Sequence, residues 1–248
     1  MIKKFRRMAQ DRLLKRGIEV RKAPASYRPL PVFELVVESL MAKHGDTLKF
    51  VQIGANDGKY FDPLRPYILN RGWTGVLVEP QPPLFEQLKA NYAECADRLA
   101  FENVAISDGD SLRLYLPPEG YKPARAEMQP ESMVSNNPAV LAQQLDVSTS
   151  SLQSIDVPAM TLDALFAKHS IAELDLLQID AEGYDWQILQ TLDLSAVSPT
   201  LIQLETGHLG RRDLAAVAKH LCDAGYDFHY GGWTSDGIAL KSDFLSGQ

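Results

Sequence analysis

The 248-residue chain has little cysteine, no long apolar segment and only a modest excess of charge. Its two cysteines, Cys95 and Cys222, lack the spacing of a metal site, which favours a reducing compartment. No run approaches the ~20 apolar residues of a membrane span, and the start lacks the apolar stretch of roughly 7–15 residues of a signal peptide. A net charge of −7 gives no reason to expect nucleic acid. These absences predict a cytoplasmic globular protein.

Two common nucleotide-binding fingerprints are also missing from the first glycine-rich turn. The segment 49–58 reads Lys-Phe-Val-Gln-Ile-Gly-Ala-Asn-Asp-Gly, so Gly54 and Gly58 are the only glycines in it. A dinucleotide site requires Gly-x-Gly-x-x-Gly, and a phosphate loop requires Gly-Lys-Ser/Thr. The turn therefore disfavours a pyrophosphate ligand. A nicotinamide-dependent oxidoreductase is kept only as an alternative.

What the segment does show is a strand, a glycine turn, a helix and a second strand, 74–78, which ends at Glu79. In doubly wound α/β domains such a turn lets a ligand approach the backbone, and the acid accepts hydrogen bonds from two ribose hydroxyls. Without a phosphate cradle, this pattern predicts a nucleoside ligand such as S-adenosylmethionine. The alternative is a tight turn that needs glycine only for its backbone conformation.

Alternating apolar runs and amphipathic stretches predict one α/β domain over residues 32–248. Strands that alternate with helices favour parallel pairing, with helices on both faces of the sheet. The loop between the last two strands is too short for a parallel crossover, so an antiparallel hairpin is expected there. The strands are expected near 48–53, 74–79, 100–106, 174–180, 200–205, 226–230 and 237–241. The helices are expected near 32–44, 63–71, 82–94, 162–169, 184–192 and 211–224.

The two remaining segments differ in composition from this domain. Residues 1–31 are interpreted as a basic N-terminal segment and linker, because residues 1–22 hold nine lysines and arginines against two acids. A helix over 2–16 would be basic and amphipathic, which predicts peripheral membrane contact through residues 1–22; a solvated tail is the alternative. Residues 107–154 contain a strand-like run at 112–116 and are polar and rich in proline after it. They are expected to form an irregular substrate-loop insertion.

Acidic residues follow a third predicted strand at the edge where open α/β sheets bind ligands. Asp180 and Glu182 come directly after the apolar run 174–179. Two neighbouring acids are costly to bury without a partner. They are expected to contact the substrate, to act as a base or to bind a metal. Capping of the following helix is the alternative, more so for Asp185.

The strand 200–205 brings a histidine to the same edge. His208 follows Glu205 closely, whereas the other histidines lie on predicted helices or on the last hairpin. Imidazole titrates near the working pH, so His208 is a candidate base or substrate contact. A structural role is the alternative.

Over about residues 48–241 the chain resembles the FkbM-type, S-adenosylmethionine-dependent methyltransferases. The resemblance rests on six segments in this order: Phe-Val-Gln-Ile-Gly-Ala-Asn-Asp-Gly (50–58), Gly-Val-Leu-Val-Glu-Pro (75–80), Phe-Glu-Gln-Leu-Lys-Ala-Asn (85–91), Asn-Val-Ala-Ile-Ser-Asp (103–108), Thr-Leu-Asp (161–163) and Ile-Asp-Ala-Glu-Gly (179–183). It implies a class I methyltransferase fold, with a Rossmann-like, seven-stranded, mostly parallel sheet and an antiparallel last strand. That expectation agrees with the hairpin inferred from loop length.

The resemblance also implies roles for particular residues. The glycine turn would wrap the methionine part of S-adenosylmethionine, Glu79 with Pro80 would hold the ribose, and Asn103 to Ala105 would border the adenine. Asp180 and Glu182 would lie beside the methyl group and the substrate. The implied cofactor-binding residues are Gly54, Ala55, Asn56, Asp57, Gly58, Glu79, Pro80, Asn103, Ala105 and Asp180.

Two positions depart from the pattern of the family. Gln52 stands where many class I enzymes have an acid that helps to hold the cofactor's amino group, and Gln178 stands where many family members have a lysine. The first substitution affects the expected amino-group contact, and the second affects the charge of Asp180.

The predicted function is methylation of a hydroxyl on a sugar, a glycan precursor or another small metabolite. A hydroxyl nucleophile needs its proton accepted, and the candidates in order are Asp180, His208 and Glu182. No resident metal is predicted; the alternative is Mg²⁺ held by Asp180, Glu182 and Glu205. A non-catalytic cofactor-fold module that binds a membrane or a partner is the remaining alternative.

Overall fold

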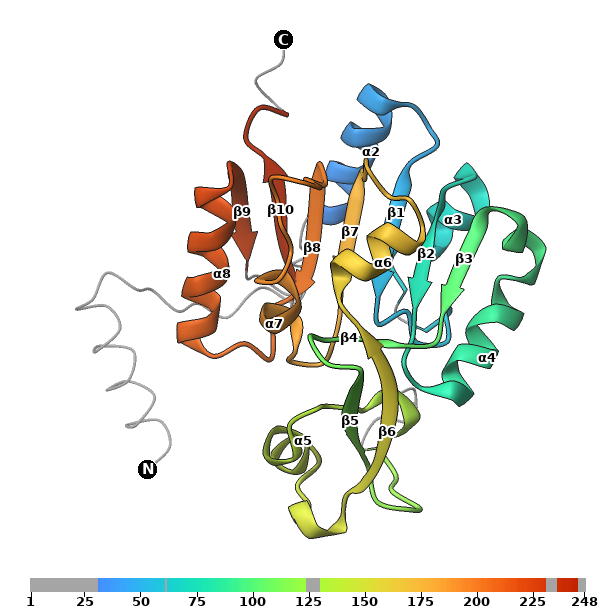
Figure 1. Ribbon diagram of the computed structural model, residues 1–248, viewed down its shortest axis with the longest axis vertical. Coiled ribbons are helices and arrows are strands. Elements are labelled where there is room, and N and C mark those ends of the chain that lie inside the picture. The colour runs from blue at the N-terminus through green and yellow to red at the C-terminus, as the bar shows by residue number, and fades with distance from the viewer. Residues whose placement is uncertain (1–30, 61, 124–129, 231–235, 245–248) are drawn as a thin grey trace, which may run out of the picture. The chain divides into compact units, whose positions relative to one another are not determined.

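The described part of the chain is built around one mixed β-sheet. In the computed structural model, which describes residues 31–60, 62–123, 130–230 and 236–244, seven strands lie in the order β3-β2-β1-β7-β8-β10-β9 (Figure 1). All neighbouring pairs are parallel except those of β10, which runs antiparallel to β8 and β9. The predicted sheet is confirmed. Its strands are β1 (Lys49–Ile53), β2 (Thr74–Val78), β3 (Leu99–Glu102), β7 (Leu176–Ile179), β8 (Leu201–Glu205), β9 (Tyr226–Tyr230) and β10 (Asp236–Lys241).

Helices cover both faces of this sheet, as predicted (Figure 1). One face packs against α2 (Val32–His44), α3 (Arg65–Arg71) and α4 (Pro82–Asn91). The other packs against α6 (Leu162–Lys168), α7 (Asp185–Leu189) and α8 (Arg211–Asp223). The expected helix at 82–94 is shorter than predicted, because a 3₁₀ helix, Ala93–Arg98, takes over after Asn91. The basic segment, its helix at 2–16 and nearly all of the expected linker lie outside the described residues.

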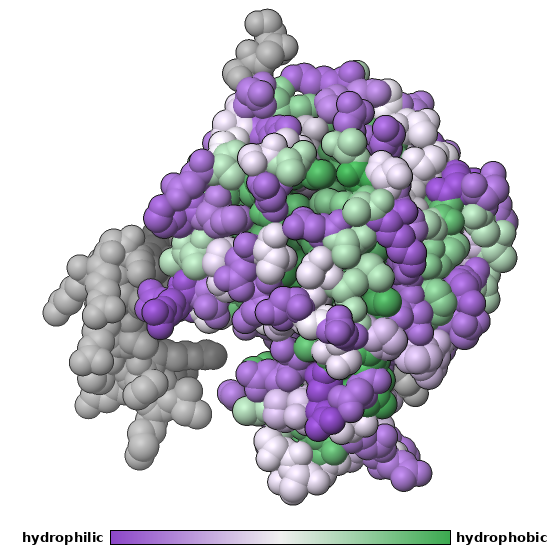
Figure 2. Space-filling model, viewed as in Figure 1, coloured by the Kyte–Doolittle hydropathy of each residue, from purple (hydrophilic) through white to green (hydrophobic). Residues whose placement is uncertain are grey.

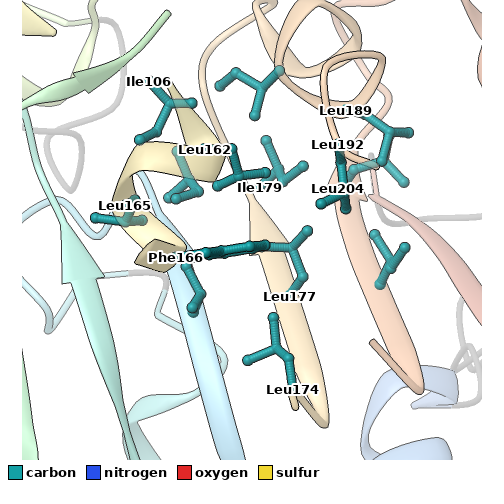
Figure 3. Packing of buried hydrophobic residues seen from close by; sticks show 14 of the residues in the cluster. Ile106, Leu162, Leu165, Phe166, Leu174, Leu177, Ile179, Leu189, Leu192 and Leu204 are labelled. Carbon is teal, nitrogen blue, oxygen red and sulfur yellow. The ribbon is translucent and has the colours of Figure 1, made fainter. Parts of the chain in front are cut away.

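The two cores follow from the alternation of side chains along buried strands. In β1, Val51 and Ile53 face the side of α6, whereas Phe50 faces the side of α2. Figure 3 shows Leu162 and Phe166 of α6 packed over β7, in the same cluster as Leu177 and Ile179. Because parallel strands are covered on both faces, they read as continuous apolar runs.

The segment 107–154 is not irregular, so that part of the prediction is wrong. It contributes to a second sheet, of order β4-β6-β5, built from β4 (Ala105–Ile106), β5 (Ser111–Leu116) and β6 (Gln153–Met160). It also contains α5 (Pro138–Leu145), whose first turn is capped by the Asn137 side chain. Leu141, Leu145 and Met133 form a small core beneath α5. The polar residues, which had suggested a loop, in fact cap these elements and connect them. The predicted strand at 112–116 is confirmed.

The predicted strand 100–106 is in fact divided between the two sheets. It splits into β3, which pairs with β2, and β4, which pairs with β6. Within β4, Ile106 joins the core of the large sheet and Ala105 joins the core of the small sheet. This strand therefore fixes the small sheet, hereafter the β5–β6 lobe (residues 105–160), against the large one.

One face of the described residues carries mixed hydrophilic and hydrophobic side chains. Figure 2 views the face with α6, α7 and α8 and shows hydrophilic side chains over the outer sides of α8 and α4. None of the helices in the described ranges combines the length and hydropathy needed to cross a bilayer.

The burial of β7 leads to a stability prediction. Leu177→Ala removes a fully buried side chain, so we expect the free energy of unfolding to fall by about 2–5 kcal/mol. The matched variant is Leu35→Ala, at a side chain that is 52% exposed, and it should change stability by less than about 0.5 kcal/mol. Urea unfolding followed by circular dichroism measures both. Equal losses would contradict the assignment of β7 to the core.

Candidate active site

A cavity of about 730 Å³ lies at the carboxyl ends of the central strands. Glu79, which follows β2, and Asp180, which follows β7, both line it, together with the glycine turn after β1. The β5–β6 lobe supplies the facing wall through residues that include Leu112, Leu114, Ser132, Val134, Asn136 and Gln144. The two carboxylates expected to share one crevice therefore do so.

The glycine turn is set by the close approach of β1 and β7. Gly54 has a φ of 79°, and a Cβ atom placed on it would lie 1.8 Å from the carbonyl oxygen of Asp180. Any side chain would push these strand ends apart, so only glycine fits here. The amide of Gly54 donates to the carbonyl oxygen of Val78 at 2.9 Å, which also holds the turn against the end of β2. Backbone thus forms the floor of the cavity, leaving space for a ligand.

Glu79 is the most constrained acid beside the turn. It is 4% exposed, and its carboxylate accepts hydrogen bonds from the amides of Asn56 and Gln81, each at 2.9 Å. Burial raises the pKa of Glu79 to about 7, although the two amides and a hydrogen bond from the Gln81 side chain favour the ionised form. A carboxylate has about four acceptor positions, so the group can still accept a hydrogen bond from a ligand hydroxyl.

Three of the residues implied as cofactor contacts do not line the cavity but shape the loops that do. Asp57 accepts hydrogen bonds from the amides of Lys59 and Tyr60 at 2.9 Å. Gly58 lies against the ring of Tyr92. Asn103 donates to the carbonyl oxygens of Glu79 and Pro80 at 2.9 and 3.1 Å. The other seven implied contacts all line the cavity. They are Gly54, Ala55, Asn56, Glu79, Pro80, Ala105 and Asp180.

His208 lies between two carboxylates on the other side of the cavity. Its Nε2 atom is 3.4 Å from Glu182 and 3.2 Å from Glu205. Hydrogen bonds to both acids raise the pKa of His208 to about 10, so the ring is protonated at neutral pH. An imidazolium cannot accept a proton, which ranks His208 below Asp180 as a base. Its charge instead offsets part of the surrounding acidity.

Asp180 carries the most perturbed carboxyl group of the site. Burial raises its pKa well above the usual range, and the neighbouring charges of Glu205 and Glu182 raise it further. A carboxylate with a raised pKa is a stronger proton acceptor when ionised, which is the property expected of a general base. The raised pKa of Asp180 is consistent with the expectation that it acts as the base.

Asp185 has a structural role, although not the capping of the following helix that was considered for it. It is fully buried, and its carboxylate accepts hydrogen bonds from the amides of Ala181 at 3.3 Å and Gly183 at 3.1 Å, which both precede α7. These contacts close the turn in which Glu182 adopts a φ of 50°. The turn that Asp185 holds presents Glu182 to His208.

Sequence reasoning missed two acids that line the cavity. Asp62, just before α3, accepts hydrogen bonds from Gln52 at 3.1 Å and from the hydroxyl of Tyr92 at 2.6 Å. Asp236 begins β10 and lies opposite Glu205 in the antiparallel register. The only sequence signal for Asp62 is its place before a helix. Nothing in the sequence sets the register that brings Asp236 to Glu205.

The sheet order, the cavity at the strand ends and the paired acids together define a class I methyltransferase fold. The chain belongs to the family described as the methyltransferase FkbM domain, whose pattern matches residues 52–228. S-adenosylmethionine is accordingly the cofactor that the site accommodates. The family resemblance stated from the sequence is confirmed.

A solved structure of an FkbM methyltransferase agrees with the fold. The methyltransferase FkbM from Methylobacillus flagellatus KT is 13% identical, with a TM-score of 0.50. The match covers 79% of this chain and 44% of that one, so this chain spans less than half of the longer protein. The N-terminal domain of human METTL16 is also 13% identical, with a TM-score of 0.46 over 93% of this chain and 78% of that one. No curated protein matches the sequence.

The raised pKa of Glu79 predicts pH-dependent cofactor binding. Ribose hydroxyls donate hydrogen bonds to the ionised form of Glu79, so the affinity for the cofactor should reach its maximum above pH 7. It should weaken by up to roughly tenfold per pH unit as Glu79 becomes protonated below its pKa. Calorimetric titration with S-adenosylhomocysteine across that range measures the slope. In Glu79→Gln, which cannot ionise, the steeper part of the slope should disappear; an unchanged slope would remove Glu79 from the ribose site.

Proposed function

We propose that this protein transfers a methyl group from S-adenosylmethionine to a hydroxyl of a sugar, a glycan precursor or a similar small metabolite. The observation that carries the proposal is the shared cavity of Glu79 and Asp180. One acid is hydrogen-bonded and placed to hold a ribose. The other is buried among like charges and placed to accept a proton.

The residues present fit the cofactor at the glycine end of the cavity. Gly54 carries no side chain and lines the cavity, so a ligand there can contact its backbone directly. Glu79 would hold the ribose hydroxyls, and Pro80 and Ala105 would border the adenine beyond them. When bound, S-adenosylmethionine supplies a methyl group on a positively charged sulfur, which the surrounding carboxylates favour.

The reaction requires proton removal from the acceptor. S-adenosylmethionine would supply the methyl group to the acceptor oxygen and leave as S-adenosylhomocysteine, while Asp180 would accept the hydroxyl proton. Holding the three reacting atoms near a line supplies much of the rate enhancement. Asp185 and His208 would serve this geometry by fixing the turn that carries Asp180 and Glu182.

The wall of the β5–β6 lobe supports a sugar-like acceptor. Ser132, Asn136 and Gln144 offer neutral donors and acceptors that match hydroxyl groups. Leu112 and Leu114 offer the apolar surface that the C–H face of a sugar ring can contact. Mixed walls of this kind select a polyol over a purely apolar ligand.

Two substitutions separate cofactor binding from methyl transfer. Glu79→Gln should weaken S-adenosylhomocysteine binding by roughly ten- to hundredfold, because a charge-assisted hydrogen-bond acceptor is lost. Asp180→Asn should reduce kcat by roughly 10²–10⁴-fold with a much smaller effect on binding, because the proton acceptor is lost. Calorimetry and release of S-adenosylhomocysteine measure the two quantities.

The matched control is Glu173→Gln, at a side chain that is 86% exposed, precedes the amino end of β7 and does not line the cavity at its carboxyl end. It should leave both quantities unchanged. Wild-type kcat in Asp180→Asn would exclude Asp180 as the base and would return the role to Glu182 or His208.

A further inference from the structure

The acceptor end of the cavity is unusually rich in negative charge. Six carboxylates line the whole cavity: Asp62, Glu79, Asp180, Glu182, Glu205 and Asp236. Among the described residues of its lining there is no lysine or arginine, and His208 is already engaged by Glu182 and Glu205. A ligand that fills this space without adding positive charge would leave carboxylates buried and unbalanced, at a high cost in free energy.

The register of the sheet concentrates three of these acids. Ile179 of β7 lies beside Leu204 of β8, so Asp180 and Glu205 follow as neighbours about 4.8 Å apart across the strands. Asp236 of β10 then lies opposite Glu205. Glu79 follows β2, which is separated from β8 by β1 and β7. Glu205 and Asp236 are therefore on the side of Asp180 that is away from the ribose site. The methyl acceptor must lie on that same side.

A row of buried glutamines points to the same chemistry independently of the acids. Gln52, Gln178 and Gln203 are in register on β1, β7 and β8, and each is at most 5% exposed. Gln52 and Gln203 donate through Nε2 to Asp62 and Asp236, at 3.1 and 2.9 Å. These bonds fix the amide orientation, because a flipped amide would place oxygen against oxygen.

The amide oxygens of these glutamines are left as acceptors. Within the described residues, nothing donates to Oε1 of Gln52, Gln178 or Gln203, and Oε2 of Glu205 is likewise buried and without a donor. Gln178 lines the cavity and lies two residues before Asp180, so both side chains leave the same face of β7. Buried acceptors of this kind are normally satisfied. Gln52, Gln178 and Glu205 line the cavity, so a ligand there can supply the missing donors, whereas Gln203 does not line it.

We propose that the methyl acceptor carries a protonated amine close to the reacting hydroxyl, as an amino sugar or another amino alcohol does. This inference rests on the proposed function and specifies its substrate class. The ammonium lies beside Glu205 and Gln178, where its three N–H groups can donate to buried oxygen atoms that have no other donor. The hydroxyl then faces Asp180. An ammonium in this position also relieves the repulsion between Glu205 and Asp180, which keeps the base ionised.

The proposal makes a prediction about charge selectivity. A matched series of glycosides of one sugar, bearing 2-aminoethyl, 2-hydroxyethyl or carboxymethyl groups, presents the same ring with positive, neutral or negative charge. The corresponding trans-2-substituted cyclohexanols present the same charges without a sugar. We expect turnover and affinity for the protein loaded with S-adenosylhomocysteine to fall in the order amine, neutral, carboxylate. Each step should be at least roughly tenfold, as for charge-assisted hydrogen bonds.

Two variants test the residues, and one serves as a control. Glu205→Gln keeps the shape of the side chain but removes its charge, so the preference for the amine should fall by roughly tenfold or more. Gln178→Lys places a lysine ammonium in this position. It should therefore lower affinity and turnover for the amine acceptor and raise both for the neutral acceptor. Glu173→Gln should keep the wild-type order. If Glu205→Gln fails to fold, Gln178→Lys decides the matter.

The outcomes distinguish this inference from the proposed function. Turnover that is independent of charge, or highest for the carboxylate, overturns the inference while methylation stands. If only the cyclohexanols are turned over, and in the expected order of charge, the acceptor is not a sugar but the inference of an amine stands. No turnover of any hydroxyl rejects the proposed function; amine binding that depends on Glu205 then supports the site, and no amine binding overturns it. Stimulation of neutral acceptors by Mg²⁺ or Mn²⁺, abolished by EDTA, assigns the position to a metal held by Glu182, Glu205 and His208 instead.

Discussion

The contact between the ends of β1 and β7 at Gly54 is the constraint on which the rest of the site depends. Because the carbonyl oxygen of Asp180 occupies the space of a side chain at Gly54, these two strands pair up to their last residue. That pairing brings Asp180 to the same rim as Glu79 and opens a backbone floor between them. A larger residue would separate the acids and fill the floor at once.

Burial of acids beside that floor explains the electrostatics of the site. Burial raises the pKa values of Glu79, Asp180 and Glu182, and like charges raise those of Asp180 and Glu182 further. Such an arrangement reduces the stability of the protein alone at neutral pH. It is consistent with a site whose ligands bring positive charge, first on the sulfur of the cofactor and, as we infer, again on the acceptor. The glutamine row extends this logic into the sheet, since amides accept hydrogen bonds without adding more charge.

Much of the large sheet was predictable from the sequence, since buried parallel strands leave continuous apolar runs and the last loop was too short for a crossover. Glu79 and Asp180 were predictable for the same reason, because each directly follows such a run. In the β5–β6 lobe, β5 was predictable from its alternation, but β6 was not, because it is partly exposed and interrupted by Pro158. Asp236 was missed because its partnership with Glu205 depends on antiparallel register, a property of paired strands that neither strand carries alone.

The division of one apolar run into β3 and β4 separates the wall of the cavity from its floor. The chain leaves the large sheet at Asn103, builds the β5–β6 lobe, and returns through β6 directly into α6. Both junctions lie side by side, because Ala105 pairs with Ala159, and Asn103 holds the first junction to the backbone of Glu79 and Pro80. Substitutions confined to residues 111–152 can therefore reshape one wall of the cavity while the strand ends that carry Glu79 and Asp180 keep their places.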